Sequence, residues 1–571
     1  MAHQMPHQIE TDVLIVGTGP TGLVLANLLG KRGIDVMIID KRDRLIDYPR
    51  GVGLDDESYR TIQAMDLLEE VRPYTLPHHV MRIVNGHGEV ILTNDPQGQP
   101  FGHARKYGFL QPDVDAQMHK GLERYPNVTS RFSQELVGIE DHGDFVEATI
   151  EQVSGTEGEE RTGETRKVKA RILVGAEGGR SFTRKWMGVD FAGVSPSTRW
   201  VVVDIRNDPL GFPNVYLGAD PARPYVSIGL PHGVRRFEFL LFDDEPSERV
   251  EEDAFVQELL SEHLPVHLEE LDIIRRRVFT HHGRVASDFR KGNVLIAGDA
   301  AHLMPVWMGQ GFNSGVRDAT NLAWKIEAVV RGTCSPDILD TYSQERSDHA
   351  HAMVDLSLTM GNVIKQTDRR IAFGRDLASR AMNLSPAVKS YFSDMRFKPM
   401  PRYTRGVVVD QESLNPGEAG RKVSTKRRPK LIPWRNVLDK NSVVGVQFIQ
   451  PHVTVNGQRA LLDDFLGSGF AVIGWGMDTT RHLSPEMVEE LRNRGFSFVC
   501  CVSPNQVEWA EGSAADHVTV AADDDGALKK WFDLHSIGTV IVRPDRFVAA
   551  ACLNGDLTEA LQAVQKAMFA L

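Results

Sequence analysis

Apolar residues at the start of the chain form two short runs separated by a helical pattern. The run 11–17 (TDVLIVG) leads into GTGPTG, residues 23–31 are good helix formers, and a second apolar run follows at 35–40 (DVMIID). Short apolar runs bounded by glycine indicate buried strands, and the segment between them indicates a helix. This order predicts a βαβ unit and therefore a doubly wound α/β domain, which we expect to occupy residues 1–190.

Alternating segments farther along the chain predict a second, largely antiparallel sheet. Strand patterns recur at 199–205, 225–230 and 236–242. We therefore expect residues 191–290 to form an inserted sheet, with strands near 76–110 contributing to it. A buried-strand pattern at 293–297 and a helical pattern at 315–330 predict that residues 291–400 return to the first domain.

A polar segment separates the last part of the chain from the rest. Residues 401–433 are rich in Pro, Gly and charge, and their basic stretch (RKVSTKRRPK) contains no aromatic residue. This composition favours an exposed linker over a nucleic-acid patch. Beyond it, the strand patterns FAVIGWG and FSFVCCV alternate with helical patterns, which predicts a separate small α/β domain over residues 434–571.

Composition narrows the class of function. The 571 residues carry 65 Lys and Arg against 77 Asp and Glu, a net charge of −12, which argues against a nucleic-acid partner. No apolar run approaches the roughly 18 residues of a membrane span. The four cysteines form no CxxC pair, and the histidine pairs lack metal-ligand spacing. We therefore expect a cytoplasmic protein with no membrane partner and no metal.

The glycine-rich turn fits the phosphates of a dinucleotide. Gly17 permits the turn, Gly19 lets backbone approach a pyrophosphate, and Gly22 allows the helix to pack closely on the strand. Asp40 falls 18 residues after Gly22, where a carboxylate accepts hydrogen bonds from ribose hydroxyls. The alternative is a purely structural glycine turn. With one such fingerprint, we expect one tightly held adenine dinucleotide, either NAD or FAD.

Two later segments decide between these cofactors. Residues 174–181 (VGAEGGRS) with Arg184, and residues 298–325 (GDAAHLMPVWMGQGFNSGVRDATNLAWK), follow the glycine motif. In this order the three motifs resemble the flavoprotein aromatic hydroxylases, the single-component FAD monooxygenases. The resemblance covers about residues 10–400. It implies a Rossmann-like FAD-binding fold of the GR2 type with an inserted antiparallel substrate sheet. The C-terminal domain resembles the thioredoxin-like appendage of phenol hydroxylases without its redox dithiol.

The resemblance also implies a reaction. NADH or NADPH would visit transiently to reduce bound FAD, and O2 would add to give a C4a-hydroperoxyflavin. One oxygen atom would then pass to the ring of a small phenolic acid, a hydroxyphenylpropionate, beside its hydroxyl group. We expect a homodimer, with the C-terminal domain serving packing or assembly. The alternatives are a flavin hydroxylase of resorcinol, phenol or a polyketide ring, and a non-catalytic flavin-binding assembly protein.

The expected cofactor residues come from the motifs and from the resemblance. By resemblance, Asp299 would hydrogen-bond the ribityl chain of FAD and Arg50 would reach the pyrophosphate. Gln111 would contact the sugar chain, and Leu136 would place backbone against the adenine. Glu177 stands where the family usually has Asp. The first motif and the acid supply the remaining expected contacts: Gly17, Gly19, Pro20, Thr21, Gly22, Asp40 and Lys41.

A second helix N-terminus is expected beneath the flavin ring. The free N–H groups at the start of a helix favour negative charge, and reduced flavin carries its negative charge around N1 and the C2 carbonyl. Small glycines would let the ring lie against backbone. The residues expected here are Gly309, Gln310, Gly311, Phe312 and Asn313.

Two residues of the same segment are candidates for catalysis. By resemblance, Pro305 would present its backbone carbonyl to the substrate pocket. His302 has two interpretations of equal weight. A neutral imidazole could relay a phenolic proton, or the residue could be a structural histidine beneath the loop.

Four aromatic or sulfur-containing side chains are candidates for substrate binding. Trp307 and Met308 either line the ring pocket or pack against the next helix. Tyr216 and Tyr225, on the inserted sheet, are candidates to donate hydrogen bonds to the phenolate.

Overall fold

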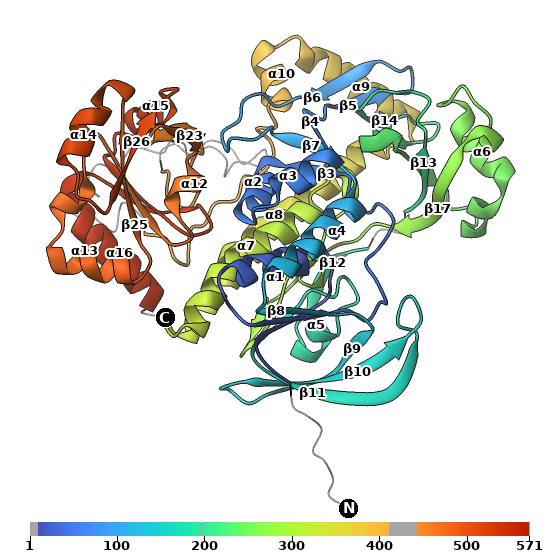
Figure 1. Ribbon diagram of the computed structural model, residues 1–571. Coiled ribbons are helices and arrows are strands. Elements are labelled where there is room, and N and C mark those ends of the chain that lie inside the picture. Colours follow the sequence, from blue (N-terminus) through green and yellow to red (C-terminus); the bar gives the residue numbers. More distant parts are fainter. Residues whose placement is uncertain (1–8, 196–197, 410–441, 570–571) are drawn as a thin grey trace, which may run out of the picture. The chain divides into compact units, whose positions relative to one another are not determined.

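The computed structural model describes residues 9–195, 198–409 and 442–569 and divides the chain into two units (Figure 1). The first comprises residues 1–98, 104–323 and 350–398, and the second comprises 99–103, 324–349 and 399–571. Residues 324–349 thus group with the second unit, whereas the sequence pattern assigned all of 291–400 to the first domain. Most of the expected linker, 401–433, lies outside the described residues. The expected α/β class is confirmed.

A mainly parallel sheet forms the base of the first unit. Val13 pairs with Ile172 on one side and Val36 on the other, and all three are buried. Strands buried on both faces read as continuous apolar runs, which explains the pattern of this region. The parallel strands lie in the order β20 (Val294–Ile296), β11 (Glu160–Gly175), β1 (Ile9–Val16), β2 (Val36–Ile39) and β8 (Val128–Arg131).

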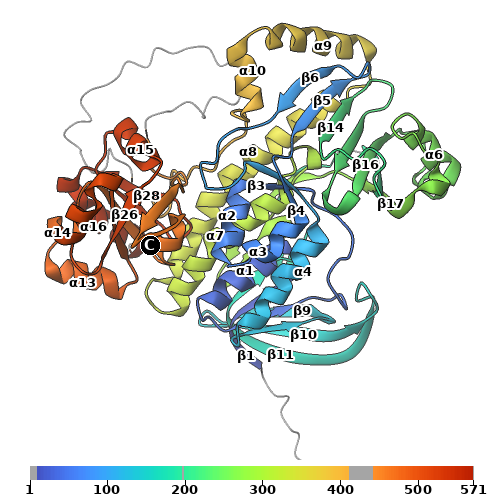
Figure 2. The same ribbon diagram turned by 45° about the horizontal axis from the view of Figure 1, so that its top comes forward.

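Helix α1 (Pro20–Lys31) connects β1 to β2. Pro20 stands at its first turn, where a missing N–H costs nothing, and Gly33 follows its end with a φ of +72°. On the other side of β1, β10 (Val146–Ser154) and β9 (Gln134–Asp141) continue from β11 as an antiparallel ribbon. Figure 2 shows this ribbon curving below α1 and α4 (Gln111–Gly121).

A seven-stranded sheet occupies the middle of the first unit. One face is covered by the apolar residues of α6 (Asp253–Ser261), and the other packs against Trp307 and Ile364 of later segments. The strand order is β17 (Asp272–Thr280), β13 (Arg199–Arg206), β16 (Arg235–Leu241), β15 (Tyr225–Gly229), β14 (Val215–Ala219), β5 (Met81–Asn85) and β6 (Val90–Asn94). The pairing is antiparallel except between β14 and β5.

Long helices and small sheets complete the first unit. Among the described residues, none of the helices combines the length and the apolar character needed to cross a bilayer. The helices are α2 (Asp56–Ala64), α9 (Arg369–Asn383) and α10 (Pro386–Ser393), together with the part of α7 (Gly311–Val330) before residue 324 and the part of α8 (Asp340–Ile364) after residue 349. One small sheet joins β3 (Gly53–Asp55), β7 (Lys106–Phe109) and β4 (Thr75–Pro77).

The second unit contains a mixed sheet with helices. Its central strands β26 (Val518–Asp523), β25 (Ser497–Val502) and β24 (Ala471–Trp475) are parallel, and β27 (Thr539–Val542) and β28 (Val548–Cys552) follow antiparallel. Cys500 and Cys501 are neighbours in β25, and both are buried free thiols. The helices α13 (Pro485–Asn493), α14 (Val507–Ser513), α15 (Ala527–His535) and α16 (Leu557–Phe569) complete this unit.

A network of buried charges lies within the second unit. The Glu345 carboxylate accepts hydrogen bonds from Lys325 Nζ at 2.7 Å and from Arg543 Nη1 at 2.7 Å, and all three side chains are 0% exposed. Arg543 also pairs with Asp545 at 2.7 Å. Burial raises the pKa of Glu345, but the two cations hold that pKa at about 2.

Removing the Glu345 charge should therefore destabilise the second unit. In Glu345→Gln, two buried cations lose the carboxylate that they share, and we expect the free energy of unfolding to fall by about 3–5 kcal/mol. Urea denaturation at neutral pH measures this loss, with the exposed Glu508→Gln as the control. The depressed pKa stabilises the fold above about pH 4.5, and that contribution disappears as pH falls toward 2. The wild-type protein should therefore lose more stability than Glu345→Gln over this range, and equal pH dependence would contradict the assignment.

Candidate active site

The glycine turn between β1 and α1 uses its three glycines in two ways. Gly17 has a φ of +111°, and a Cβ there would lie 2.4 Å from the Ala176 carbonyl oxygen. A Cβ on Gly22 would lie 2.0 Å from the Gly17 oxygen. These two glycines permit contact between backbone segments. A Cβ on Gly19 would meet no heavy atom within 4 Å, so a pyrophosphate can approach the N-terminus of α1 at this position.

Thr21 is the point where three segments meet. A Cβ on Gly298 would lie 2.4 Å from Thr21 Oγ1, and a Cβ on Gly315 would lie 2.2 Å from the same atom. Gly298 begins the GDAAH segment with a φ of +62°, and Gly315 lies near the start of α7. The structure thus brings the first and third sequence motifs together, with Pro20 and Thr21 opening α1 between them.

Asp40 lies beside the glycine turn, as its position after β2 predicted. Its Oδ2 accepts hydrogen bonds from Thr18 N at 2.8 Å and Thr18 Oγ1 at 3.0 Å, and its Oδ1 accepts one from Arg42 N at 2.9 Å. The Asp40 carboxylate therefore holds the backbone of the glycine turn in place through Thr18. Lys41, the next residue, is exposed.

The start of β9 adjoins the same acid. Gln134 N donates to the Asp40 carbonyl oxygen at 2.9 Å, which places this strand next to the turn. Leu136 follows two residues later, its side chain is buried, and its backbone partner in β10 is Ile150 at a shift of register. The backbone of Leu136 is therefore near the Asp40 side of the turn.

Arg50 and Asp299 come together from distant parts of the sequence. Arg50 Nη2 lies 4.0 Å from Asp299 Oδ2, and both side chains are partly exposed. Gln111 Oε1 accepts a hydrogen bond from Gly51 N at 2.5 Å, and Gln111 Nε2 donates to Asp115 Oδ2 at 3.0 Å. Burial raises the pKa of Asp115 to about 7, against the opposing effects of Gln111 and Arg50.

The backbone carrying Arg50 is held by charges that the sequence analysis missed. Arg236 Nη1 donates to the Arg50 carbonyl oxygen at 2.9 Å, and Arg275 Nη2 donates to the Pro49 oxygen at 2.5 Å. Both guanidinium groups pair with the fully buried Asp204, at 2.8 and 2.7 Å. An acid inside the apolar run RWVVVDI was the available signal, because buried charges need partners.

The segment before α7 presents backbone to the site. Gly309 has a φ of +61°, and a Cβ on Gly311 would meet no heavy atom within 4 Å. Asn313 Nδ2 donates to the Gly309 and Gly53 oxygens at 2.8 and 3.1 Å, and its Oδ1 accepts from Asp55 N at 3.1 Å. The Asn313 side chain therefore anchors the segment to β3, and its backbone remains for a ligand.

Gln310 and Phe312 also direct their side chains into the protein. Gln310 Oε1 accepts a hydrogen bond from Arg317 Nη1 at 3.3 Å, and Arg317 forms a buried ion pair with Asp55. The Phe312 ring packs edge-on against Phe109, with centroids 4.9 Å apart. Contacts to a cofactor from residues 309–313 are thus available from backbone N–H groups.

His302 lies beneath the loop. Its Nε2 is 2.7 Å from Asp318 Oδ2, and both side chains are 0% exposed. The same Asp318 oxygen accepts a hydrogen bond from Gly298 N at 2.9 Å. This geometry favours the structural interpretation of His302 over a proton relay, because a relay must reach its substrate.

The residues after His302 enter two different apolar clusters. Trp307 packs edge-on against Trp200 at 4.8 Å, whereas Met308 joins a separate cluster on α8 and α10. Pro305 and Trp307 line a small pocket together with His281 and Lys365. The three polar members of this pocket, Thr198, His281 and Lys365, were not among the sequence candidates for substrate binding.

Tyr216 and Tyr225 do not join this group. Successive side chains of a strand alternate between its faces, and Leu217 and Val226 occupy the face that packs with Trp307. Tyr225 lies on the opposite face, where its ring packs at a tilt against His263 with centroids 4.1 Å apart. Tyr216 precedes Leu217, so it also points away from Trp307. The structure therefore places both tyrosines on the face of the sheet opposite Trp307, and their hydrogen bond to a phenolate stays a prediction.

Glu177 binds within its own loop. One carboxylate oxygen accepts hydrogen bonds from Thr183 N at 3.0 Å and Thr183 Oγ1 at 2.6 Å, and the other accepts from Ser181 Oγ at 2.6 Å. The longer acid thus braces the start of α5 (Phe182–Met187). Arg184 donates to the Ala300 oxygen at 2.9 Å, which ties the second motif to the third.

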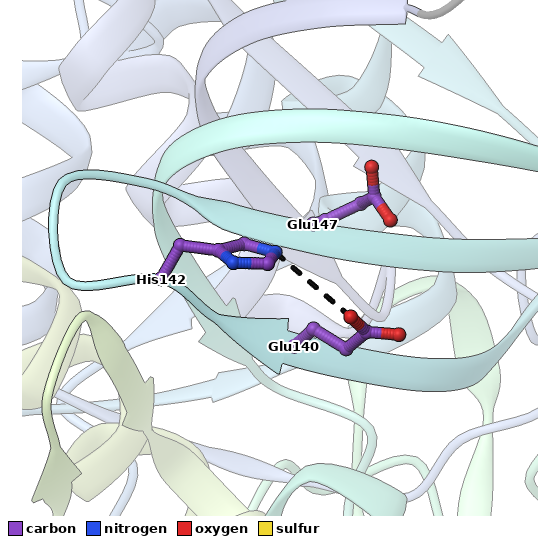
Figure 3. Close-up of side chains that lie close together, drawn as sticks. All are labelled: Glu140, His142 and Glu147. Atoms are coloured by element: carbon purple, nitrogen blue, oxygen red, sulfur yellow. Dashed lines mark ion pairs between the residues drawn. The ribbon is translucent and has the colours of Figure 1, made fainter.

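One group of possible metal ligands lies on the β9–β10 ribbon, away from the residues above. Figure 3 shows Glu140 and Glu147 on adjacent strands, with His142 in the turn between them. His142 Nε2 is 3.9 Å from Glu140, and Glu147 already pairs with Lys167. All three side chains are at or near the surface, so the group is a solvated charge cluster.

Comparison with known proteins adds independent support for a flavin site. Residues 10–357 match the FAD binding domain family, and residues 445–567 match the HcaD C-terminal domain. A Mycolicibacterium gilvum protein named 3-(3-hydroxy-phenyl)propionate/3-hydroxycinnamic acid hydroxylase is 46% identical, covering 96% of this chain and 90% of its own length. A Shigella sonnei protein of the same name is 44% identical, covering 98% and 95%.

Solved structures share the fold. The flavin-dependent monooxygenase PieE, in complex with FAD and substrate, has a TM-score of 0.77 at 19% identity, covering 99% of this chain and 100% of its own. Aklavinone-11 hydroxylase with FAD and aklavinone has a TM-score of 0.73 at 21% identity, covering 99% and 100%. Glycines that leave room for a pyrophosphate, together with a sequence match over most of the chain, establish that this protein belongs to the FAD-binding aromatic hydroxylase family.

Proposed function

We propose that this protein is an NAD(P)H- and O2-dependent FAD monooxygenase that converts 3-(3-hydroxyphenyl)propionate to 3-(2,3-dihydroxyphenyl)propionate. The observation that carries the proposal is the identity of 44–46% to hydroxylases named for this acid, extending over at least 96% of the chain. The convergence of the glycine turn, Asp299 and the backbone of 309–313 supports it, because these are the parts that a flavin site requires.

The protein's part in this reaction is to bind and orient. FAD, when bound, supplies the electron transfer and oxygen chemistry. The open position at Gly19 receives the pyrophosphate, and Arg50 and Asp299 meet the phosphate and ribityl groups. The N–H groups before α7 favour negative charge on the ring. Pro305 and Trp307 border the substrate, and the surrounding apolar cluster excludes water.

Coupled turnover tests the proposal directly. We expect oxygen-dependent NADH oxidation that is stimulated by 3-(3-hydroxyphenyl)propionate, with nearly one catechol product per NADH by chromatography. Stimulation with peroxide and little product would point to resorcinol, phenol or polyketide substrates. Bound FAD with no response to any phenol would point to a non-catalytic flavin protein. Parallel assays with NADPH determine the nucleotide preference.

The contrast between Gly19 and Gly22 gives a test of the FAD site. Gly19→Val adds a side chain where no atom lies within 4 Å, so the unfolding midpoint of the apoprotein should not change. We expect its FAD affinity to fall about tenfold or more, since the side chain takes the space of the pyrophosphate. Gly22→Ala, with a contact of 2.0 Å to backbone, should instead destabilise the fold. Unchanged FAD affinity in Gly19→Val would remove Gly19 from the cofactor site.

Substitution of His302 distinguishes its two interpretations. His302→Gln should lower the free energy of unfolding by about 1–3 kcal/mol, because Asp318 loses a buried partner. The pH profile of ring hydroxylation should keep its shape, measured as product formation across pH 5–9. A profile that loses one limb in this variant would establish a proton relay.

Location and assembly are part of the same proposal. We expect the protein in the cytoplasm, where NADH or NADPH would be its reductant, and we expect a homodimer. Cell fractionation and light scattering of the holoenzyme measure these two properties.

A further inference from the structure

The pocket beside Pro305 contains a buried polar atom without a partner. The His281 side chain is 5% exposed, and its Nε2 has no hydrogen-bond partner in the described structure. Trp200 and Trp307 surround the imidazole, with ring centroids 5.8 and 5.2 Å away. Buried polar atoms in native proteins are nearly always satisfied, and an exception calls for a missing partner. A ligand that occupies the pocket would supply that partner.

A second unpartnered donor lies in the same aromatic group. Trp200 Nε1 is buried and also has no hydrogen-bond partner in the described structure. The Trp200 ring is 0% exposed and stacks on His281 with an interplanar angle of 12°. Two adjacent rings therefore bury polar nitrogens among apolar neighbours, which is unusual in a site that has only a packing role.

Lys365 supplies positive charge to this pocket. It follows the C-terminus of α8, lines the pocket with His281 and Pro305, and is half-buried. No carboxylate lines the pocket, and no ion pair of the Lys365 ammonium is found within residues 9–195, 198–409 and 442–569. The cation is thus placed beside an unpartnered imidazole without an acid to neutralise it.

The imidazole is neutral in this environment. Burial lowers the pKa of His281 to about 3, and the charge of Lys365 adds to that effect. A neutral imidazole has one N–H and one acceptor nitrogen. His281 can therefore donate one hydrogen bond to an anion that Lys365 attracts, without adding a second positive charge.

The size of the pocket indicates which part of a ligand it takes. Its volume is about 10 Å3, close to the space of one water molecule. An aromatic ring does not fit, but an oxygen atom at the end of a ligand does. Pro305, Trp307 and Leu358 form the apolar part of the lining, and Thr198, His281 and Lys365 form its polar part.

We propose that Lys365 and His281 bind the carboxylate of the phenolic acid and thereby fix which end of the substrate enters this pocket. This assignment rests on the proposed hydroxylase function and names the charged partner that such a substrate requires. Lys365 supplies the ion pair and His281 a hydrogen bond, and together they select acids over neutral phenols. The pair binds and orients the substrate and takes no part in the oxygen transfer.

The test compares an acid with its neutral analogue. Calorimetry measures the Kd of 3-(3-hydroxyphenyl)propionate and of 3-(3-hydroxyphenyl)propan-1-ol for the FAD-loaded protein. In Lys365→Met we expect the Kd of the acid to rise about tenfold or more, because a charge-assisted bond is lost, while the Kd of the alcohol changes less than about twofold. Lys365→Arg should restore most of the acid affinity. His281→Phe, which keeps an aromatic ring in place, should raise the Kd of the acid by a smaller factor.

Controls separate this assignment from the proposed reaction. Lys389→Met removes an exposed cation from α10 and should leave both Kd values unchanged. Unfolding midpoints of all variants exclude a loss of fold. Equal losses for acid and alcohol, or an unchanged acid Kd in Lys365→Met, would overturn the carboxylate site while the wild-type enzyme still hydroxylates the acid. A wild-type protein that binds neither compound would overturn the proposed substrate together with this site.

Discussion

The site depends on a steric constraint, the absence of side chains where three backbone segments meet at Thr21. Gly298 and Gly315 approach its hydroxyl so closely that a single methyl group at either position would overlap it. Gly22 and Gly17 form a similar contact between the helix and the turn. Because each glycine contributes only backbone to these contacts, the segments can pack closely around Thr21. The glycines without close neighbours, Gly19 and Gly311, are then left for the ligand.

Polar side chains around the site serve mainly to anchor loops. Asn313 ties the segment before α7 to β3, and Glu177 braces the second motif. Asp204 holds two arginines whose other hydrogen bonds reach the backbone at 49–50. A buried ion pair offers little net stability but a strong geometric preference, since any displacement leaves a charge unpaired. The loops that surround a flavin are therefore positioned by groups that need not touch it.

Sequence reasoning predicted the parts of this site that depend on local spacing. The glycine turn and Asp40 follow from residue types at fixed separations, and the association of the first and third motifs follows from the resemblance to the flavoprotein hydroxylases. The orientation of the inserted sheet could not be predicted in this way. Alternation along a strand separates two faces, but it does not indicate which face packs against Trp307. The position of Tyr216 and Tyr225 on the face away from Trp307 could not be predicted for this reason. The sequence also could not indicate the partners of His302 and of the Arg50 backbone, because Asp318 and Arg236 reach them only when separate elements pack together.

The chain passes between the two units more than once, and this limits how the protein can evolve. Residues 324–349 belong to the second unit, although the chain before them and after them belongs to the first. The buried charges of the second unit accordingly draw Lys325 and Glu345 from mid-chain and Arg543 from near the end. A protein that lacked the C-terminal region would keep Lys325 and Glu345 but lose Arg543, the third member of their buried charge network. Recombination therefore cannot replace the C-terminal region freely, because a replacement must also supply the buried cation that pairs with Glu345.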